Sequence, residues 1–522
     1  MKKTCFFSIA LFACLSYLQA QTKVFKEVSD EISSEIKIIK QDNNLVGYLA
    51  FTRLEKASED SFNYRISIMD ENLNDIGAIN FREESLTLQD IAFEQDVLCI
   101  AYIKSNVIGN SYNRKEYRGV KDNSRNYVML QFLGLDGKII KINSIKANIN
   151  LNASYDQTSK LAASGNLKYP LEINNIPQIG FACFYGDENS TTLTAYNPAG
   201  EQLWQKKVAQ EEQFFIMHTT PNDVYLLAKH KDDRAIEGGF ELLGYSVKDG
   251  SPYDRFNLQD KQGNDLKVLA FDNDPATGKL FLSGSIIDQY KGNEISTGGQ
   301  FSHGPYTGVF TININGPKKA DFAQTYSYWG DGSQGKSIST KGRFSDNNSY
   351  ALFNQSFRDY DGNTYFTGSA LIKKPKWGSI ISSIVFAPLV MPTIFILGAA
   401  GTTKCKLTDV VLVKQNPKGA LGLDQSVTVQ NTGFYRGAMP LSVYNNRSFY
   451  RVLNSDTKTN YLVIDDSKDI LIYNVNKKTV QRTIPHKDGQ IKTNVYPAKE
   501  GHVLISEYNK KEKYTRFSIE AL

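Results

Sequence analysis

Two stretches of the sequence contain the residue types of ligand-binding loops. The first, Gly330–Ser337, matches the pattern of a phosphate-binding loop, in which glycine backbone N–H groups wrap phosphates and a helix starts behind the lysine. The residues that follow do not predict a helix, because they soon enter the turn-forming run Asp346–Asn348. Leu462–Asp466 imitates the acidic partner strand of such a site. We interpret the two segments as a polar loop and an ordinary strand.

The second stretch places oxygen-bearing side chains at alternate positions, as calcium loops do. Asp359, Asp361 and Asn363 have this spacing, with Gly362 between the last two. The glycine comes too early for a helix-loop-helix calcium site, and no glutamate stands at the required later position. A tight hairpin turn is our first interpretation of this segment, and a surface calcium ion is the alternative.

Other residues that commonly do chemistry lack the necessary spacing. The five histidines form no zinc-binding motif, and no nucleophile-elbow motif is present. We therefore predict no cofactor and no catalytic residue. A pair of catalytic carboxylates that is distant in the sequence but close in the fold could not be recognised from residue spacing. The long loop from Asp288 to Tyr306 contains Tyr290 and His303, which we predict as part of a ligand-binding rim. A solvated loop between strands is the alternative.

The first twenty residues predict export. Lys2 and Lys3 precede an apolar run that is too short to span a bilayer, and residues 1–20 end with a small residue before Gln21. A lipoprotein anchored through Cys14 is the alternative. The three cysteines of the mature chain show no paired spacing and are expected to be buried free thiols, with one bridge as the alternative. We expect the mature chain, residues 21–522, in the periplasm or at the cell surface.

Alternation of apolar and polar residues with a period of two dominates the mature chain and predicts an all-β fold. Seven hairpins recur, each with an Asp, Asn, Gly or Pro turn between two strands, as at Asp136–Gly137 and Asn197–Gly200. Four strands in each repeat fit a single β-propeller of about seven blades, with six to eight allowed. We expect the segment after Val24 to close the ring against Tyr514–Ile519. Tandem β-sandwich domains are the alternative.

One segment breaks the pattern. Residues 377–403 contain no charge, which on length and apolarity alone would indicate a membrane span. Pro388 and Pro392 interrupt any helix there, and a single span would prevent ring closure. We expect two apolar arms that pack on the body, plug the channel, or touch a membrane surface or partner. The contact residues would then include Trp377, Phe386 and Phe395.

The overall composition narrows the possible functions. Hydrophobic residues make up 41% and charged residues 22% of the chain, as in globular proteins, and a net charge of +5 gives no sign of nucleic-acid binding. The leader ending Leu18–Ala20 and the repeated hairpins, such as Thr408–Asn416, resemble a family of uncharacterised exported propeller-like proteins of Bacteroidota. That resemblance implies no site residue. We expect a non-catalytic binding or scaffolding propeller of the cell envelope, with an envelope protein or glycan as partner. A propeller hydrolase or lyase acting on glycans or peptides is the alternative.

Overall fold

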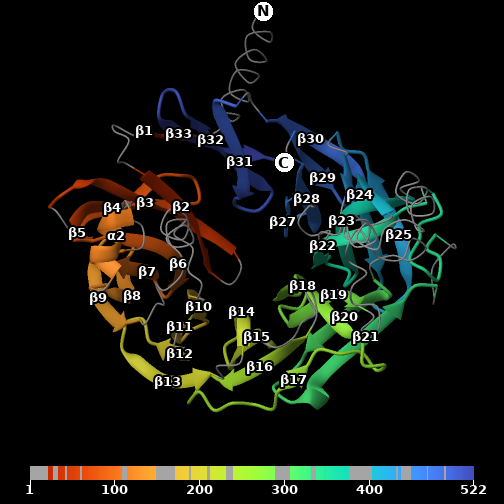
Figure 1. Cartoon of the computed structure of the whole chain (residues 1–522), viewed down its shortest axis with the longest axis horizontal. Helices are drawn as coiled ribbons and strands as arrows, with labels where there is room; N and C mark the ends of the chain where they lie inside the picture. The colour runs from red at the N-terminus through yellow and green to blue at the C-terminus, as the bar shows by residue number, and fades with distance from the viewer. Residues whose placement is uncertain are drawn as a thin grey trace, which may run out of the picture.

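The computed structural model describes a ring of β-sheets around a central channel (Figure 1). It describes residues 21–522 except 27–32, 42–43, 59–60, 108–113, 122, 148–170, 187–189, 209–211, 231–238, 288–305, 331–336, 347, 376–402, 431–432, 437–447, 467 and 487–488. Within these residues the strands form eight antiparallel sheets, which we call blades 1 to 8. Each blade has four strands, of which the first lies nearest to the centre of the ring and the fourth lies outermost, and blade 6 has a fifth strand (Figure 1).

The strands of the first four blades follow one another along the chain. Blade 1 contains β2 (Ser33–Gln41), β3 (Asn44–Lys56), β4 (Ser61–Asp70) and β5 (Asp75–Glu84). Blade 2 contains β6 (Leu86–Glu94), β7 (Val97–Ser105), β8 (Asn126–Gly134) and β9 (Ile139–Lys146), with the helix α2 (Arg114–Lys121) between its second and third strands. Blade 3 contains β10 (Leu171–Ile176), β11 (Gly180–Gly186), β12 (Thr191–Tyr196) and β13 (Gln202–Val208). Blade 4 contains β14 (Glu212–Thr219), β15 (Asp223–His230), β16 (Phe240–Ser246) and β17 (Phe256–Asn257).

The remaining blades complete the ring. Blade 5 contains β18 (Asp265–Asn273), β19 (Leu280–Ile287), β20 (Gly308–Ile314) and β21 (Phe322–Tyr328), with the short helix η3 (Lys319–Asp321) before its last strand. Blade 6 contains β22 (Tyr350–Arg358), β23 (Thr364–Pro375), β24 (Thr403–Gln415), β25 (Leu421–Val427) and the added β26 (Gly433–Arg436). Blade 7 contains β27 (Ser448–Asn454), β28 (Thr459–Asp465), β29 (Asp469–Asn474) and β30 (Thr479–Pro485). Blade 8 contains β31 (Ile491–Pro497), β32 (His502–Asn509), β33 (Tyr514–Ala521) and β1 (Gln21–Lys26).

The two ends of the chain close the ring in blade 8. Strand β1 pairs antiparallel with β33, with Val24 opposite Arg516 and Thr22 opposite Ser518. Phe25 also meets Phe517 edge to face, with ring centroids 5.6 Å apart. The predicted closure is confirmed, although the closing strand already begins at Gln21. The expected all-β propeller is confirmed as well, with eight blades rather than the seven at the centre of the predicted range.

Burial follows the position of a strand within its blade. The second strands are the most buried, and β11 and β19 are buried along their whole length, because neighbouring blades cover both of their faces. The outermost strands, such as β5 and β9, alternate between exposed and half-buried residues. The alternation in the sequence is therefore clearest in the outer strands, and the inner part of each blade reads as a continuous apolar run.

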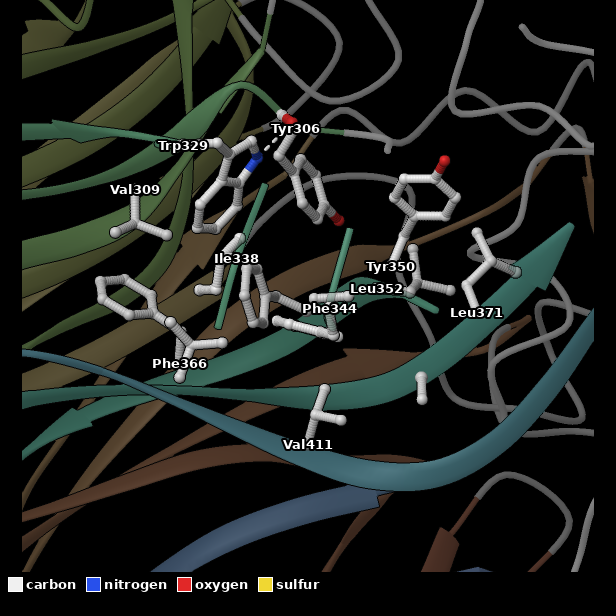
Figure 2. Packing of buried hydrophobic residues seen from close by; sticks show 14 of the residues in the cluster. Tyr306, Val309, Trp329, Ile338, Phe344, Tyr350, Leu352, Phe366, Leu371 and Val411 are labelled. Carbon is white, nitrogen blue, oxygen red and sulfur yellow. Dashed lines mark hydrogen bonds between the residues drawn. The ribbon is translucent and has the colours of Figure 1, made fainter. Parts of the chain in front are cut away.

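The core consists of apolar clusters between adjacent blades. Figure 2 shows one of them, in which blades 5 and 6 and the segment that joins them meet. The indole N–H of Trp329 donates a hydrogen bond of 2.5 Å to the Tyr306 carbonyl, and the ring of Tyr306 stacks on Phe353 at 5.6 Å. Ile338 and Phe344 pair as an isolated β-bridge and bury their side chains in this cluster. The segment after the phosphate-loop pattern is thus a packed bridge and not a helix.

The apolar insertion joins two strands that lie side by side. Strands β23 and β24 pair with each other up to Pro375 and Thr403. Residues 376–402 lie outside the described residues, and so do Trp377, Phe386 and Phe395. Within the described part of the chain, no helix is long and apolar enough to cross a membrane.

Candidate functional site

A cavity of about 840 Å³ occupies one mouth of the central channel. Its lining comes from the first strands of the blades and from the turns that join first and second strands, and seven of the eight blades contribute to it. The turn residues are Pro177, Gln178, Pro221, Pro275, Tyr360, Ser455 and Ala498. The residues on or beside the first two strands include Lys40, Leu45, Thr219, Asp272, Gln355, Arg451 and Leu453. We call this cavity the channel pocket.

The two mouths of the channel differ in their connections. Strand direction alternates within a blade, so the connections between second and third strands, and those between blades, lie at the mouth opposite the channel pocket. The strand ends that border residues 148–170, 288–305, 376–402 and 437–447, which lie outside the described residues, are all at this second mouth. The channel pocket is therefore surrounded by tight turns, whose backbone is constrained by short hairpins.

Four prolines stiffen the rim of the pocket. Pro177, Pro221 and Pro275 stand in the first turns of blades 3, 4 and 5, and Pro497 ends the first strand of blade 8. Because the pyrrolidine ring fixes φ, these positions lose little conformational entropy when a ligand binds. The rim is thus largely preorganised.

Arg358 fixes one side of the pocket by a buried ion pair. It is the last residue of β22, and its guanidinium donates to the Asp274 carboxylate at 2.9 Å and to Asn313 Oδ1 at 2.7 Å. The same guanidinium lies over the ring of Phe281, 4.2 Å from its centroid. Burial alone would raise the pKa of Asp274, but Arg358 and two backbone N–H groups outweigh burial and hold that pKa below its ordinary value. Blades 5 and 6 are thereby locked together.

Arg451 is the principal cation of the pocket. It lies on β27 in blade 7 and donates a hydrogen bond of 2.9 Å from Nη1 to the backbone carbonyl of Arg358. It is half-buried, and the ion pairs found among the described residues do not include it. Burial lowers the pKa of the Arg451 guanidinium, and the negative charge of Asp272 opposes this effect. The ordered Arg358 carbonyl therefore holds in place a guanidinium that has no counter-ion in direct contact.

Asp272, on β18 of blade 5, brings a negative charge to the pocket. Its Oδ1 accepts the N–H of Asn273 at 2.7 Å, and it also takes no part in the ion pairs of the described residues. Asn273 in turn meets the His218 ring nitrogen at 3.2 Å. Burial lowers the pKa of His218, while Asp272 acts to raise it. Tyr360 completes this region, with its hydroxyl 3.1 Å from that of Ser455.

Beyond the pocket, carboxylates join the innermost strands of neighbouring blades. Asp90 on β6 accepts the N–H of Ile173 on β10 at 2.9 Å, and Glu172 on β10 accepts the N–H of Met217 on β14 at 3.0 Å. These bonds satisfy backbone groups on the free edges of the innermost strands. Burial raises the pKa of Glu172 to about 7, and the nearby Asp90 adds to that shift. Burial also raises the pKa of Asp90.

The residues predicted from the sequence either lie outside the described residues or form the turn that contains Tyr360, and none of them lines the pocket itself. Tyr290 and His303 lie outside the described residues, so the predicted rim stays a prediction. Asp359, Asp361 and Asn363 form the turn between β22 and β23, in which both Asp359 oxygens accept hydrogen bonds from within the turn. The turns after Asp70 and Asp260 have the same bonds. No group of three metal-ligating side chains occurs among the described residues.

Sequence reasoning missed Asp272, Arg358 and Arg451. They come from three blades and are separated by about ninety residues each, so no local motif joins them. Asp272 belongs to the local sequence Asp272–Pro275, which is typical of a turn, and Arg358 directly precedes the calcium-like turn. A partial signal was available for two of them, since Asp272 and Arg358 stand at or next to the end of a strand, whereas Arg451 lies in the middle of β27.

The cysteines agree with the sequence reading as far as they are described. Cys99 and Cys183 are free and fully buried in the cluster between blades 2 and 3. Burial raises the pKa of both thiols. The side chain of Cys405 lies outside the described residues.

Eight four-stranded blades closed by the chain's two ends define this chain as an eight-bladed β-propeller. The chain belongs to DUF6770, a family of unknown function whose model matches residues 1–432. The resemblance to propeller-like proteins of unknown function is confirmed to that extent, while export and bacterial source stay predictions. No curated protein matches the sequence.

Solved propellers resemble the chain only at the level of shape. The Dos1 propeller has 7% sequence identity and a TM-score of 0.44, over 96% of this chain and 95% of that chain. The WD40 domain of SCAP from fission yeast has 9% identity and a TM-score of 0.39, over 95% of this chain and 98% of that chain. AztD from Citrobacter koseri has 8% identity and a TM-score of 0.36, over 91% and 96%. At these values the similarities carry no functional argument.

Proposed function

We propose that this chain is an exported, non-catalytic binding propeller of the cell envelope, and that its ligand occupies the channel pocket. The single observation that carries the proposal is Arg451, which forms no ion pair with any described residue and lines a cavity whose size suits a small ligand. A half-buried charge without a counter-ion costs free energy in the unliganded protein, and a ligand of opposite charge recovers that cost.

The test combines a ligand screen with a variant that fills the pocket. A library of glycans and peptides is screened by thermal shift against the chain beginning at Gln21. Leu453→Trp places a bulky ring in the cavity, and Leu203→Trp enlarges an exposed leucine on the outer strand β13 as a matched control. We expect ligands that stabilise the wild type and the control but not Leu453→Trp. Ligands that bind all three proteins equally, or a screen without ligands, would contradict the proposal.

A second function is favoured by the acidic and phenolic groups at the same mouth. Asp272, Glu500 and Tyr360 lie in the channel pocket, and such groups serve acid–base catalysis in glycan and peptide cleavage. Incubation of each ligand with the protein, followed by mass spectrometry, separates the two functions. Intact ligand after long incubation supports binding alone, and cleaved ligand supports a hydrolase or lyase.

Export is tested separately in the native host. We expect an intact mass that corresponds to a chain starting at Gln21, recovered from the soluble envelope fraction. A mass that corresponds to a lipid-modified chain starting at Cys14 would contradict the soluble form and support a membrane-anchored lipoprotein.

A further inference from the structure

The chemistry of the channel pocket narrows the class of ligand. Arg451 offers a planar fork of N–H donors, which matches the two oxygens of a carboxylate. Because one of its nitrogen atoms is already bonded to the Arg358 carbonyl, the side chain needs little reorganisation to receive an anion. This points to a carboxylate-bearing ligand.

The rest of the lining suits hydroxyl groups. Thr219, Tyr360 and Ser455 bring hydroxyls to the pocket, and Asp272 and Glu500 bring carboxylates. Hydroxyls donate and accept hydrogen bonds and carboxylates accept them, so a ligand with many hydroxyls finds both kinds of partner. Such groups are typical of a sugar and not of an apolar peptide side chain.

The apolar part of the lining includes several rigid rings. The four rim prolines and the ring of Tyr360 make up about half of the apolar residues of the lining, beside Leu45, Tyr450, Val452, Leu453 and Ala498. Flat apolar surfaces of this kind pack against the C–H face of a sugar ring and need not enclose a protruding side chain. We propose that the channel pocket binds an acidic saccharide, with the sugar carboxylate on the Arg451 guanidinium. This inference rests on the proposed binding function and specifies its ligand.

The position of Asp272 allows a test of whether the bound ligand is negatively or positively charged. Its negative charge acts on Arg451, so it also repels any anion bound there. Neutralising Asp272 therefore strengthens the binding of an acidic ligand and weakens that of a cationic one. A structural role for Asp272 alone predicts no such dependence on ligand charge.

The experiment is isothermal titration calorimetry on the chain beginning at Gln21. The probes are oligosaccharides of two to six residues that contain uronate or sialate units, the same oligosaccharides with their carboxylates reduced to alcohols, and hexapeptides rich in Asp and Glu. The variants are Arg451→Gln, Arg451→Lys and Asp272→Asn. Arg82→Gln, at an exposed arginine on β5 bonded to Ser61, is the matched control. Thermal unfolding shows whether each variant folds.

We expect at least one acidic oligosaccharide to bind, and its reduced form to bind at least about tenfold more weakly. Arg451→Gln should weaken the binding of the acidic probe by about 10- to 100-fold. Arg451→Lys should weaken it by less, because lysine keeps the charge but not the planar pair of N–H donors. Asp272→Asn should tighten binding by about two- to tenfold, and Arg82→Gln should leave it unchanged.

Three results would overturn the inference. These are the absence of binding by every acidic oligosaccharide, equal binding of the acidic and reduced forms, and an unchanged affinity in a folded Arg451→Gln. Binding of neutral sugars or acidic peptides that Leu453→Trp abolishes would leave the proposed function standing and reject the acidic saccharide. Ligands that bind despite Leu453→Trp would reject both.

Discussion

Glu172 couples the stability of the inner ring to pH. Its carboxylate joins blade 3 to blade 4 through the Met217 N–H, and burial raises its pKa from 4.5 to about 7. The folded protein therefore binds this proton more tightly than the unfolded chain does. The stabilisation that this bound proton gives to the folded state is complete below about pH 4.5 and is lost as the pH rises to about 7. The difference between the two pKa values corresponds to a change of at most about 3 kcal/mol in the free energy of unfolding.

Glu172→Gln removes this dependence. The amide keeps an oxygen that accepts the Met217 N–H, and it is neutral at every pH. We expect the variant to match the wild type at low pH and to be more stable at pH 8. Between pH 5 and pH 8 the difference in the free energy of unfolding should grow by about 2 kcal/mol.

The assay is urea-induced unfolding at several pH values, followed by tryptophan fluorescence. Glu201→Gln, at an exposed glutamate bonded to Asn197 in the same blade, is the control and should leave the pH dependence unchanged. If Glu172→Gln and the wild type lose stability in parallel from pH 5 to pH 8, then burial of this carboxylate does not govern the pH dependence.

Three further predictions follow from packing. Gly284 faces a β-bulge in β18, and an added Cβ would lie 1.9 Å from the Lys267 carbonyl oxygen. Gly284→Ala should therefore lower the free energy of unfolding by about 2 to 4 kcal/mol in urea titrations, and a loss below about 0.5 kcal/mol would contradict this packing. Cys99 and Cys183 should react with a thiol reagent only after denaturation, so rapid reaction of the folded chain would show that they are accessible. Deletion of residues 21–26 should destabilise the ring by at least about 2 kcal/mol and promote dimerisation through the exposed edge of β33. A variant that remains as stable and monomeric as the wild type would refute that closure.

The sequence predicted the architecture well because each repeat carries a local signal. Every hairpin found in the sequence joins the third and fourth strands of one blade, as the turns at Gly137, Gly200 and Gly419 show. The eighth blade has no such hairpin, because its fourth strand is the N-terminal β1. Counting hairpins therefore gave seven blades, one fewer than the ring contains.

The pocket escaped prediction because it is assembled across blades. Asp274, Arg358 and Arg451 meet only after blades 5, 6 and 7 pack together. Each residue has an ordinary local reading as part of a strand or a turn, and their pairing depends on the curvature of the ring. The loop chosen from its composition, Asp288–Tyr306, lies almost wholly outside the described residues, so its part in a rim stays a prediction. Long loops attract attention in a sequence, whereas this pocket is built from short turns.

The most direct test of the account is a crystal structure of the chain beginning at Gln21 with the tightest acidic oligosaccharide bound. The account predicts the sugar in the channel pocket, with its carboxylate oxygens about 3 Å from the Arg451 guanidinium. A sugar bound at the other mouth, or in the pocket with its carboxylate turned away from Arg451, would contradict it.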